Sequence, residues 1–405
     1  DRHQQMLGQV KHFPSEGKLP DFVKDQLAAL EFHSQKKRIL LLYYGGTLGM
    51  EYKMVAGKRA LVASDNVNKL LAPLREKTMP NGKTLEDNLQ LTWFPVGKPI
   101  DSTNGRWPHW VSVANVIRLL YDHFDGFVVA GGTDTTDYLL SSLNLILPNV
   151  GKPIIGAAAQ QSIDDWGQDA AANLSFAIAT AAQNISGVYL AFANVLREGG
   201  HIFKVKDREY DAFDSPSRYV VGKFVQGEVE LEGSYQKRNG FVEKRNLAFN
   251  DNFFDGIEKV AINPFQWADT LYDMSKLKGI HALLLTTYGA GNVRDLPLFA
   301  GDPHHVEVIR KLYDDQYPLV LGTSMQDGIV DSPYESGIKV LNEAGAISGG
   351  NTNGAMLVAK MSRVLAESWD TKTGTDYVAF RKGMYKSHIG ELNEEKVKDE
   401  MLNAA

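Results

Sequence analysis

The sequence predicts a two-domain α/β protein, with a larger N-terminal domain built on a doubly wound sheet and a smaller C-terminal α/β domain. Its 405 residues exceed the roughly 250–300 at which a single hydrophobic core stops growing. Short apolar runs alternate with helical stretches, which is the rhythm of βαβ units. A polar segment over 214–256 interrupts that rhythm and indicates the boundary between the domains.

In the first half, two apolar runs end in the same tripeptide. Ile39–Tyr44 is typical of a strand buried on both faces of a parallel sheet, and it stops at Gly45-Gly46-Thr47. Phe127–Ala130 repeats the pattern and stops at Gly131-Gly132-Thr133. Further strands are expected at 153–158 and 187–193, and helices at 110–124, from the second corner to 147, and at 170–183.

The second half repeats this alternation. Strands are expected at 260–262, 282–286, 319–321 and 346–348, and helices near 304–314, 333–344 and 353–367. The polar residues before the first strand are expected to form an extension with one helix around 21–32. These expectations divide the chain into an extension (1–37), an N-terminal domain with the active site (38–225), a hairpin and linker (226–256) and a C-terminal domain (257–405).

Composition excludes several classes of protein. The net charge of −6, from 49 acidic and 43 basic residues, provides no basic field for nucleic acid. No apolar run approaches the roughly 20 residues of a membrane helix, so we expect no membrane partner. The absence of cysteine excludes disulfides, thiol nucleophiles and iron–sulfur clusters. The ten histidines are scattered, so no metal site and no cofactor are expected.

Both Gly-Gly-Thr corners lie where open α/β sheets bind ligands, outside the carboxyl ends of strands. Paired glycines let the backbone turn sharply and approach a ligand, and the threonine adds a hydroxyl. Such turns also serve ordinary strand-to-helix connections, and Asp134 or Thr135 has the alternative role of helix N-cap. Two corners with the same threonine, the second followed by Asp134, favour a site that accepts an amine.

Several motifs carry a resemblance to one family. The stretches 43–50, 125–135 and 141–153 match its signatures, with further matches at 101–103, 204, 211–216, 288–292, 345–350 and 389–392. Together they resemble the bacterial-type L-asparaginases, in particular the type I, cytosolic-like branch. The resemblance covers about 38–395 and implies the two-domain asparaginase-like fold. It also implies hydrolysis of L-asparagine to L-aspartate and ammonia, with room for a side activity on L-glutamine.

The resemblance assigns roles to individual residues. By this resemblance, Thr47 is the nucleophile that forms an acyl-enzyme. A threonine hydroxyl is a poor nucleophile by itself and needs a partner that activates it. Thr133, Lys204 and Asp134 form the supporting set, in which Lys204 prepares Thr133 to take a proton and Asp134 accepts the substrate's α-ammonium. Without the resemblance, Lys204 lies in a polar stretch, where the usual interpretation is a solvated surface charge.

The remaining assignments concern substrate binding. The loop Asp101–Thr103 binds substrate, and Ser102 and Thr103 hold its α-carboxylate. Backbone donors at Gly46 and Gly132 hold the oxyanion, and the carbonyl of Ala159 meets the leaving amide. Asn292 is the candidate contribution of a neighbouring subunit in a homodimer or homotetramer.

The sequence departs from the family pattern at several positions. Gly131 stands where a histidine is usual, and Gln168-Asp169-Ala170 keeps only the acid of a Ser-Asp-Gly stretch. The loop after the first corner has no tyrosine around 58–60, and Tyr52 is the nearest. Met325 occupies the position of a regulatory cysteine known in some relatives, so allosteric control by asparagine does not transfer.

Other functions stay open at this point. Gly131 and Gln168 motivate a catalytically weak or inactive amino-acid binding protein on the same scaffold. Gly289-Ala-Gly291 follows an expected strand, as in the nucleotide-binding motif of a dinucleotide-dependent oxidoreductase, although the third glycine of that motif is missing. The related transfer-RNA amidotransferase subunit carries an extra N-terminal β-domain, for which residues 1–37 are too short a stretch.

Two expectations remain about packing and location. Tyr43 and Tyr44 are interpreted as residues that pack a strand. The type I likeness implies a cytoplasmic location, while a chain that begins at Asp1 leaves a periplasmic or secreted location open.

Overall fold

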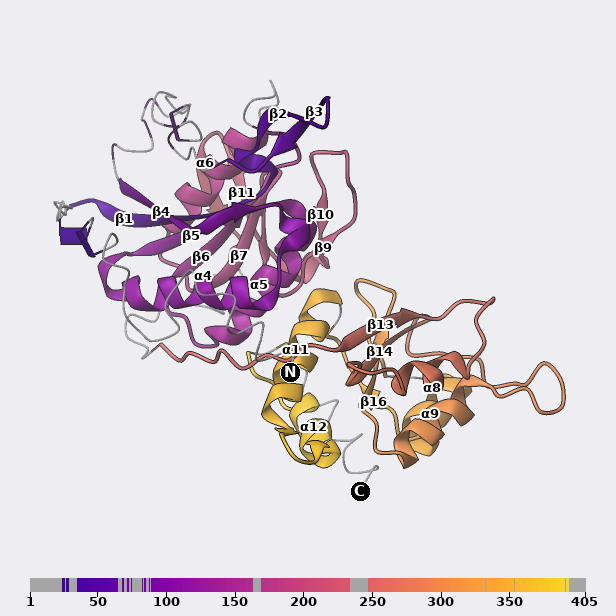
Figure 1. Ribbon diagram of the computed structural model, residues 1–405. Helices are drawn as coiled ribbons and strands as arrows, with labels where there is room; N and C mark the ends of the chain where they lie inside the picture. The colour runs from indigo at the N-terminus through magenta and orange to yellow at the C-terminus, as the bar shows by residue number, and fades with distance from the viewer. Residues whose placement is uncertain are drawn as a thin grey trace. The chain divides into compact units, whose positions relative to one another are not determined.

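A computed structural model describes residues 35–64, 89–162, 169–233 and 247–392 except 332, 353 and 390, with scattered positions at 24–28 and 68–87. The chain divides into two compact units, Asp1–Asp251 and Asn252–Ala405, which are described separately (Figure 1). Most of the helix expected around 21–32 lies outside the described residues, as does Gln168.

In its described residues, the first unit is built on an eight-stranded mixed sheet in the order β12-β11-β8-β7-β6-β5-β1-β4. Neighbours from β4 to β7 are parallel, and β8, β11 and β12 extend the sheet by antiparallel pairing. Its strands are β1 (Lys37–Gly45), β4 (Leu89–Ile100), β5 (Gly126–Ala130), β6 (Pro153–Ala157), β7 (Gly187–Phe192), β8 (Val195–Glu198), β11 (Val220–Val225) and β12 (Glu228–Leu231).

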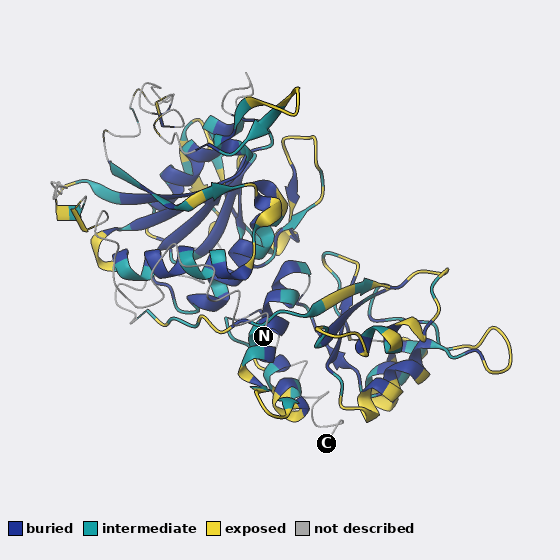
Figure 2. Cartoon of the chain, in the orientation of Figure 1, coloured by how far each residue is buried: buried dark blue, intermediate teal, exposed yellow. Residues whose placement is uncertain are grey.

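Helices cover both faces of this sheet (Figure 1). Helices α4 (Trp107–Leu120) and α5 (Thr136–Ile146) lie on one face, and α6 (Asp169–Ala181) lies on the other. Alternate residues of β1 point to opposite faces, so Tyr43 joins the core under α6 and Tyr44 faces α4 and α5. The strands between the helical layers are buried (Figure 2), which confirms the strand interpretation of the apolar runs.

Shorter elements complete the first unit. The hairpin of β2 (Glu51–Val55) and β3 (Lys58–Val62) follows the first corner, and β9 (Phe203–Lys204) pairs with β10 (Phe213–Asp214). Single 3-10 turns are η1 (Thr47–Gly49), η3 (Ser102–Asn104), η4 (Tyr121–His123), η5 (Thr133–Thr135) and η6 (Ser217–Tyr219).

The sequence interpretation missed β4, and it drew the first domain too short. Strand β4 contains Pro95, Gly97 and Pro99, which disfavour a central strand. Among the strands that the structure describes, it lies at the edge of the sheet and pairs with β1 alone, a position where proline is tolerated. Strand β12 lies inside the segment expected as hairpin and linker, yet it pairs in the first sheet, so the first unit extends past residue 225 to Asp251.

The second unit is built on a parallel sheet that has four strands in the part of the chain the structure describes, in the order β13-β14-β15-β16. Two apolar clusters, one on each face of the sheet, form its core. Its elements are β13 (Ile257–Ala261), α8 (Thr270–Ser275), β14 (Ala282–Thr287), α9 (His305–Asp314), β15 (Leu319–Thr323), α10 (Glu335–Ile338), the π-helical turn η7 (Lys339–Glu343), β16 (Ile347–Ser348), α11 (Gly354–Glu367), β17 (Trp369–Asp370), β18 (Gly374–Thr375) and α12 (Tyr377–Met384). The alternation expected in this half is confirmed.

Candidate active site

Three loops leave the first sheet at the carboxyl ends of neighbouring parallel strands, which form one edge of the sheet. Strand β1 lies between β4 and β5 and runs parallel to both, so their carboxyl ends lie together. Strand order reverses at β1, and open α/β sheets bind ligands at such a reversal. Thr47, Ser102 and Thr133 follow these strands, and each is the first residue of a 3-10 turn. The fold therefore gathers three segments that the sequence predicted for the site.

The two Gly-Gly-Thr corners meet through their backbones. Gly46 has a φ of 84°, and a Cβ placed on it would lie 2.0 Å from the amide nitrogen of Gly132. A Cβ on Gly132 would in turn lie 2.4 Å from Oγ of Ser102. Only glycine has a hydrogen where other residues carry Cβ, so both positions require glycine for this close approach.

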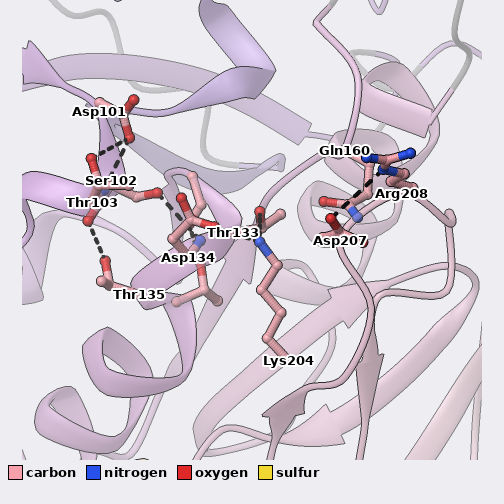
Figure 3. Close-up of polar contacts among 12 residues, drawn as sticks. Asp101, Ser102, Thr103, Thr133, Asp134, Thr135, Gln160, Lys204, Asp207 and Arg208 are labelled. Carbon is pink, nitrogen blue, oxygen red and sulfur yellow. Dashed lines mark hydrogen bonds and ion pairs between the residues drawn. The ribbon is translucent and has the colours of Figure 1, made fainter.

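Lys204 reaches the second corner from β9 and joins two of its side chains (Figure 3). Its Nζ donates a hydrogen bond to Oγ1 of Thr133 at 2.8 Å and to the carboxylate of Asp134 at 2.5 Å. The Lys204 side chain is 18% exposed and that of Asp134 is 46% exposed. The charged donor orients the Thr133 oxygen, and the Asp134 carboxylate still faces solvent. Lys204 is thus not the solvated surface charge that it would be if taken alone.

The loop after β4 is tied to the second corner by hydrogen bonds (Figure 3). Oγ of Ser102 accepts from the backbone N–H of Asp134 at 3.3 Å. Oγ1 of Thr135 donates to the Ser102 carbonyl at 2.9 Å, and Thr135 makes no side-chain cap to α5. Asp101 accepts from the N–H and the hydroxyl of Thr103, both at 3.0 Å. These contacts hold the loop in one position relative to Thr133.

Comparisons with known proteins agree with this arrangement. The family described as "Asparaginase, N-terminal" matches residues 38–237, the part that carries both corners and Lys204. The chain belongs to the asparaginase family.

Relatives extend the similarity beyond the family match. L-asparaginase 1 of Escherichia coli is 28% identical over 360 residues, which cover 88% of this chain and 98% of that protein. An L-asparaginase of Dirofilaria immitis is 26% identical over 393 residues, and the chain spans 62% of its length. The solved L-asparaginase of Thermococcus kodakarensis has a TM-score of 0.73 at 23% identity and covers 88% of this chain and 99% of its own. That likeness supports the two-domain fold.

The expectation that the backbone N–H of Gly46 holds the oxyanion is wrong. The N–H of Gly46 donates to the carbonyl of Ile100 at 2.9 Å, so it is not free to hold an oxyanion. The bond exists because the end of β1 continues its pairing with β4 up to the corner. Ala159 lies buried just beyond β6, the neighbour of β5, at the same edge of the sheet as the corners.

The sequence interpretation missed a residue that contacts two of these loops. Tyr44 precedes the first corner and was interpreted as strand packing, because its position in an apolar run matches that role. It is buried, and its ring lies against Gly131, the residue that opens the second corner. No signal in the run of apolar residues distinguishes Tyr44 from Tyr43, which does pack in the core.

Two residues beside departures from the family pattern, Tyr52 and Asp169, make their contacts outside the two corners. Tyr52 lies on β2 and stacks with Arg59, whose Cζ is 3.8 Å from the ring centroid. Asp169 begins α6 and accepts hydrogen bonds from the backbone N–H groups of Gln160 and Gln161 at 2.7 and 3.3 Å. Burial raises the pKa of Asp169, and these N–H groups partly offset the rise. Asp169 therefore holds the loop after β6.

The glycine turn of the second unit does not form a dinucleotide site. Gly289 and Gly291 lie in a tight turn closed by a bridge between Tyr288 and Asn292. The next helix, α9, begins only at His305, whereas a dinucleotide fingerprint opens directly into a helix. Asn292 is half-buried, and its Oδ1 accepts from Oγ of Ser336 at 3.4 Å.

Two further features of the described residues bear on cofactor and membrane binding. Within the described ranges, His, Asp and Glu side chains form no group of three or more that would hold a metal ion. Among the helices that the structure describes, none is both long enough and apolar enough to cross a membrane.

Proposed function

We propose that the protein is an L-asparaginase that hydrolyses L-asparagine to L-aspartate and ammonia through an acyl-enzyme on Thr47. The observation that carries the proposal is the contact of Lys204 with both Thr133 and Asp134 at a corner that abuts the corner of Thr47. A cation, a hydroxyl and a half-exposed carboxylate at one turn suit both proton transfer and recognition of an amino acid.

Bond making begins at the first corner. The hydroxyl oxygen of Thr47 attacks the carbon of the side-chain amide, and the proton that it loses passes through Thr133 to the amide nitrogen. The C–N bond then breaks, ammonia leaves, and the aspartyl group remains as an ester on Thr47. Water attacks the ester carbon, which releases aspartate and returns the proton to Thr47. Lys204 supports Thr133 in both half-reactions because its charged Nζ stabilises negative charge on the Thr133 oxygen.

Substrate recognition uses charges of opposite sign at two loops. The carboxylate of Asp134 is half-exposed and accepts the α-ammonium, which has the same charge as its present partner Lys204. Ser102 and Thr103 donate to the α-carboxylate. The N–H of Gly132 stabilises the oxyanion, and the Ala159 carbonyl accepts from the leaving amide. Asparagine and glutamine differ by one methylene, which is worth about 1–3 kcal/mol, so a side activity on glutamine is part of the proposal.

Assembly and location are finer parts of the same proposal. We infer a homodimer or homotetramer in which Asn292 of a neighbouring copy completes the site, and a cytoplasmic enzyme, both on the family likeness. Light scattering measures the assembly, and Asn292→Ala tests the shared site. Mixing that variant with Thr47→Ala should restore activity if the two residues act across subunits, and should not if they act within one.

The direct test is release of ammonia from L-asparagine and from L-glutamine. Wild-type protein is compared with Thr47→Ala and Thr133→Ala, and with Thr371→Ala, which changes an exposed threonine of the second unit, as matched control. Turnover of asparagine by wild type and control, with most of it lost in the two corner variants, supports the proposal. A wild type that binds aspartate in calorimetry without releasing ammonia from asparagine would make it an amino-acid binding protein instead.

A further inference from the structure

Tyr44 fits between two glycines that belong to different loops of the site. A Cβ on Gly131 would lie 3.0 Å from Cδ1 and 3.5 Å from Cε1 of the Tyr44 ring. A Cβ on Gly105 would lie 2.5 Å from the Tyr44 hydroxyl oxygen. Neither glycine has a positive φ, so the backbone alone does not require glycine at either position. The space that Tyr44 occupies does.

The hydroxyl end of Tyr44 lies beside the groups that hold the loop after β4. The same hypothetical Cβ on Gly105 would be 2.7 Å from Oγ1 of Thr135 and 2.9 Å from the carbonyl of Ser102, and these two atoms hydrogen-bond to each other. Burial raises the pKa of Tyr44, and the side chains of Trp110 and Thr135 partly offset the rise. Tyr44 is 2% exposed and therefore remains a neutral spacer at physiological pH.

Three segments thus meet on one side chain. Tyr44 comes from β1, three residues before Thr47. Its ring packs against Gly131, which precedes Gly132 and Thr133 in the second corner, and its hydroxyl lies against the end of η3. A rigid aromatic ring with few rotatable bonds fixes the distance between the surfaces that it separates.

We propose that Tyr44 is the positioning residue that sets the spacing between the second corner and the loop Asp101–Gly105, and so determines how tightly the site binds the α-carboxylate of its substrate. The inference rests on the proposed function, which takes Ser102 and Thr103 as the groups that bind that carboxylate. Tyr44 touches neither the substrate nor the reacting atoms, so it acts through the loop.

This role predicts a specific split between kinetic constants. The α-carboxylate lies away from the amide that reacts, so its contacts are similar in the ground state and the transition state. Loss of such uniform binding raises KM and leaves kcat nearly unchanged. A merely structural role for Tyr44 would instead lower the fraction of folded protein, which lowers the apparent kcat at constant KM.

The experiment is a double-mutant cycle of Tyr44→Ala and Gly131→Ala, measured as kcat and KM for L-asparagine. We expect Tyr44→Ala to raise KM about tenfold with kcat within about threefold of wild type. Gly131→Ala should raise KM about threefold in the wild-type background, because its Cβ pushes the ring, and have almost no effect once the ring is gone. Tyr44→Phe keeps the ring and should raise KM only about twofold.

Controls separate positioning from folding. Gly233→Ala adds a Cβ that meets nothing within 4 Å, and Tyr334→Ala removes an exposed tyrosine of the second unit; both should leave KM unchanged. Thermal unfolding midpoints show which variants are folded at the assay temperature. If Tyr44→Ala fails to fold, Tyr44→Leu, which removes the ring and keeps an apolar side chain, takes its place in the cycle with Gly131→Ala.

The outcomes distinguish this inference from the proposed function. Equal effects of Gly131→Ala in both backgrounds, or a loss of kcat at constant KM in Tyr44→Ala, would overturn the positioning role while wild-type turnover still supports the enzyme. If wild type releases no ammonia, the proposed function fails, and calorimetric titration of the same four proteins with L-aspartate tests positioning through Kd. A wild type that binds no aspartate would refute both.

Discussion

The two Gly-Gly-Thr corners have the same three residues at the same edge of one sheet, yet they present their threonines differently. Gly46 has a φ of 84°, whereas Gly132 has a φ of −92°. Thr133 is 5% exposed and accepts a hydrogen bond from Lys204. Thr47 is half-buried and begins a turn that leads into the β2–β3 hairpin.

The difference shows where local sequence stops determining chemistry. The tripeptide sets a sharp turn and places a hydroxyl at the sheet edge in both corners. The partner of that hydroxyl comes from elsewhere, because Lys204 is 71 residues away from Thr133 in the chain. One corner therefore has an accessible threonine, suited to attack, and the other has a buried and polarised threonine, suited to proton transfer.

The largest effects are expected from the two threonines themselves. Thr47→Ala should lower kcat by about 10⁴-fold or more, because it removes the nucleophile. Thr133→Ala should lower kcat by about 10²–10⁴-fold, the range of a proton-transfer group. Thr47→Ser and Thr133→Ser keep a hydroxyl and should each recover much of the loss. Steady-state kinetics with L-asparagine measures all four variants. A Thr47→Ala protein with normal kcat would contradict the assignment of attack to Thr47 and proton transfer to Thr133.

Lys204 tests why the second corner differs from the first. Lys204→Met should lower kcat about 10²–10³-fold, because Thr133 loses its charged partner. Lys204→Arg should not restore it, since a planar guanidinium does not reproduce the geometry of an ammonium group. Lys206→Met is the matched control, because Lys206 lies two residues away and pairs with Glu209 and Asp211. Similar losses in the Lys204 and Lys206 variants would point to damage of the whole β9–β10 hairpin.

The close approach of the corners is tested by adding a methyl group. Gly46→Ala combines a positive φ with a Cβ 2.0 Å from a backbone nitrogen, so it should lower the free energy of unfolding by about 4 kcal/mol. Gly57→Ala has a similar φ of 78° with open space around its Cβ, and should cost about 1–2 kcal/mol. Urea unfolding measures both, and equal losses would mean that the backbone contact contributes nothing.

A buried histidine outside both corners, His305, should make the stability of the protein depend on pH. Burial, with Arg294 and His304 nearby, lowers the pKa of His305 from 6.5 to about 4. Between these values the unfolded chain binds a proton that the folded chain does not. Stability contributed by neutral His305 is therefore full above pH 6.5 and is lost as pH falls toward 4, by about 3 kcal/mol.

Substitution isolates the contribution of this group. The expected result is that His305→Gln flattens the dependence of the free energy of unfolding on pH between 7 and 4, as measured by urea unfolding, while His123→Gln, at an exposed histidine, leaves it unchanged. At neutral pH neither change should alter KM or kcat, because both residues lie outside the corners. An unchanged pH dependence in His305→Gln would show that the histidine titrates normally.

The sequence predicted the corners because each apolar run ends abruptly in glycines, and it predicted the parallel strands because both of their faces are buried. It did not reveal β4, whose prolines are tolerated only at an edge that the sequence does not mark. It placed Lys204 at the site only through family resemblance, since β9 and β10 have two residues each. The contact of Tyr44 with Gly131 and Gly105 depends on three segments and has no local signal.

The central claim is that Thr47, and not Thr133, carries the acyl group. Rapid acid quench during turnover of L-asparagine, followed by peptide mapping with mass spectrometry, locates any covalent aspartyl group. We expect the adduct on the peptide that contains Thr47, in wild type and with altered accumulation in Thr133→Ala, and its absence in Thr47→Ala. An adduct on the peptide that contains Thr133, or continued turnover by Thr47→Ala, would contradict the assignment of the two corners.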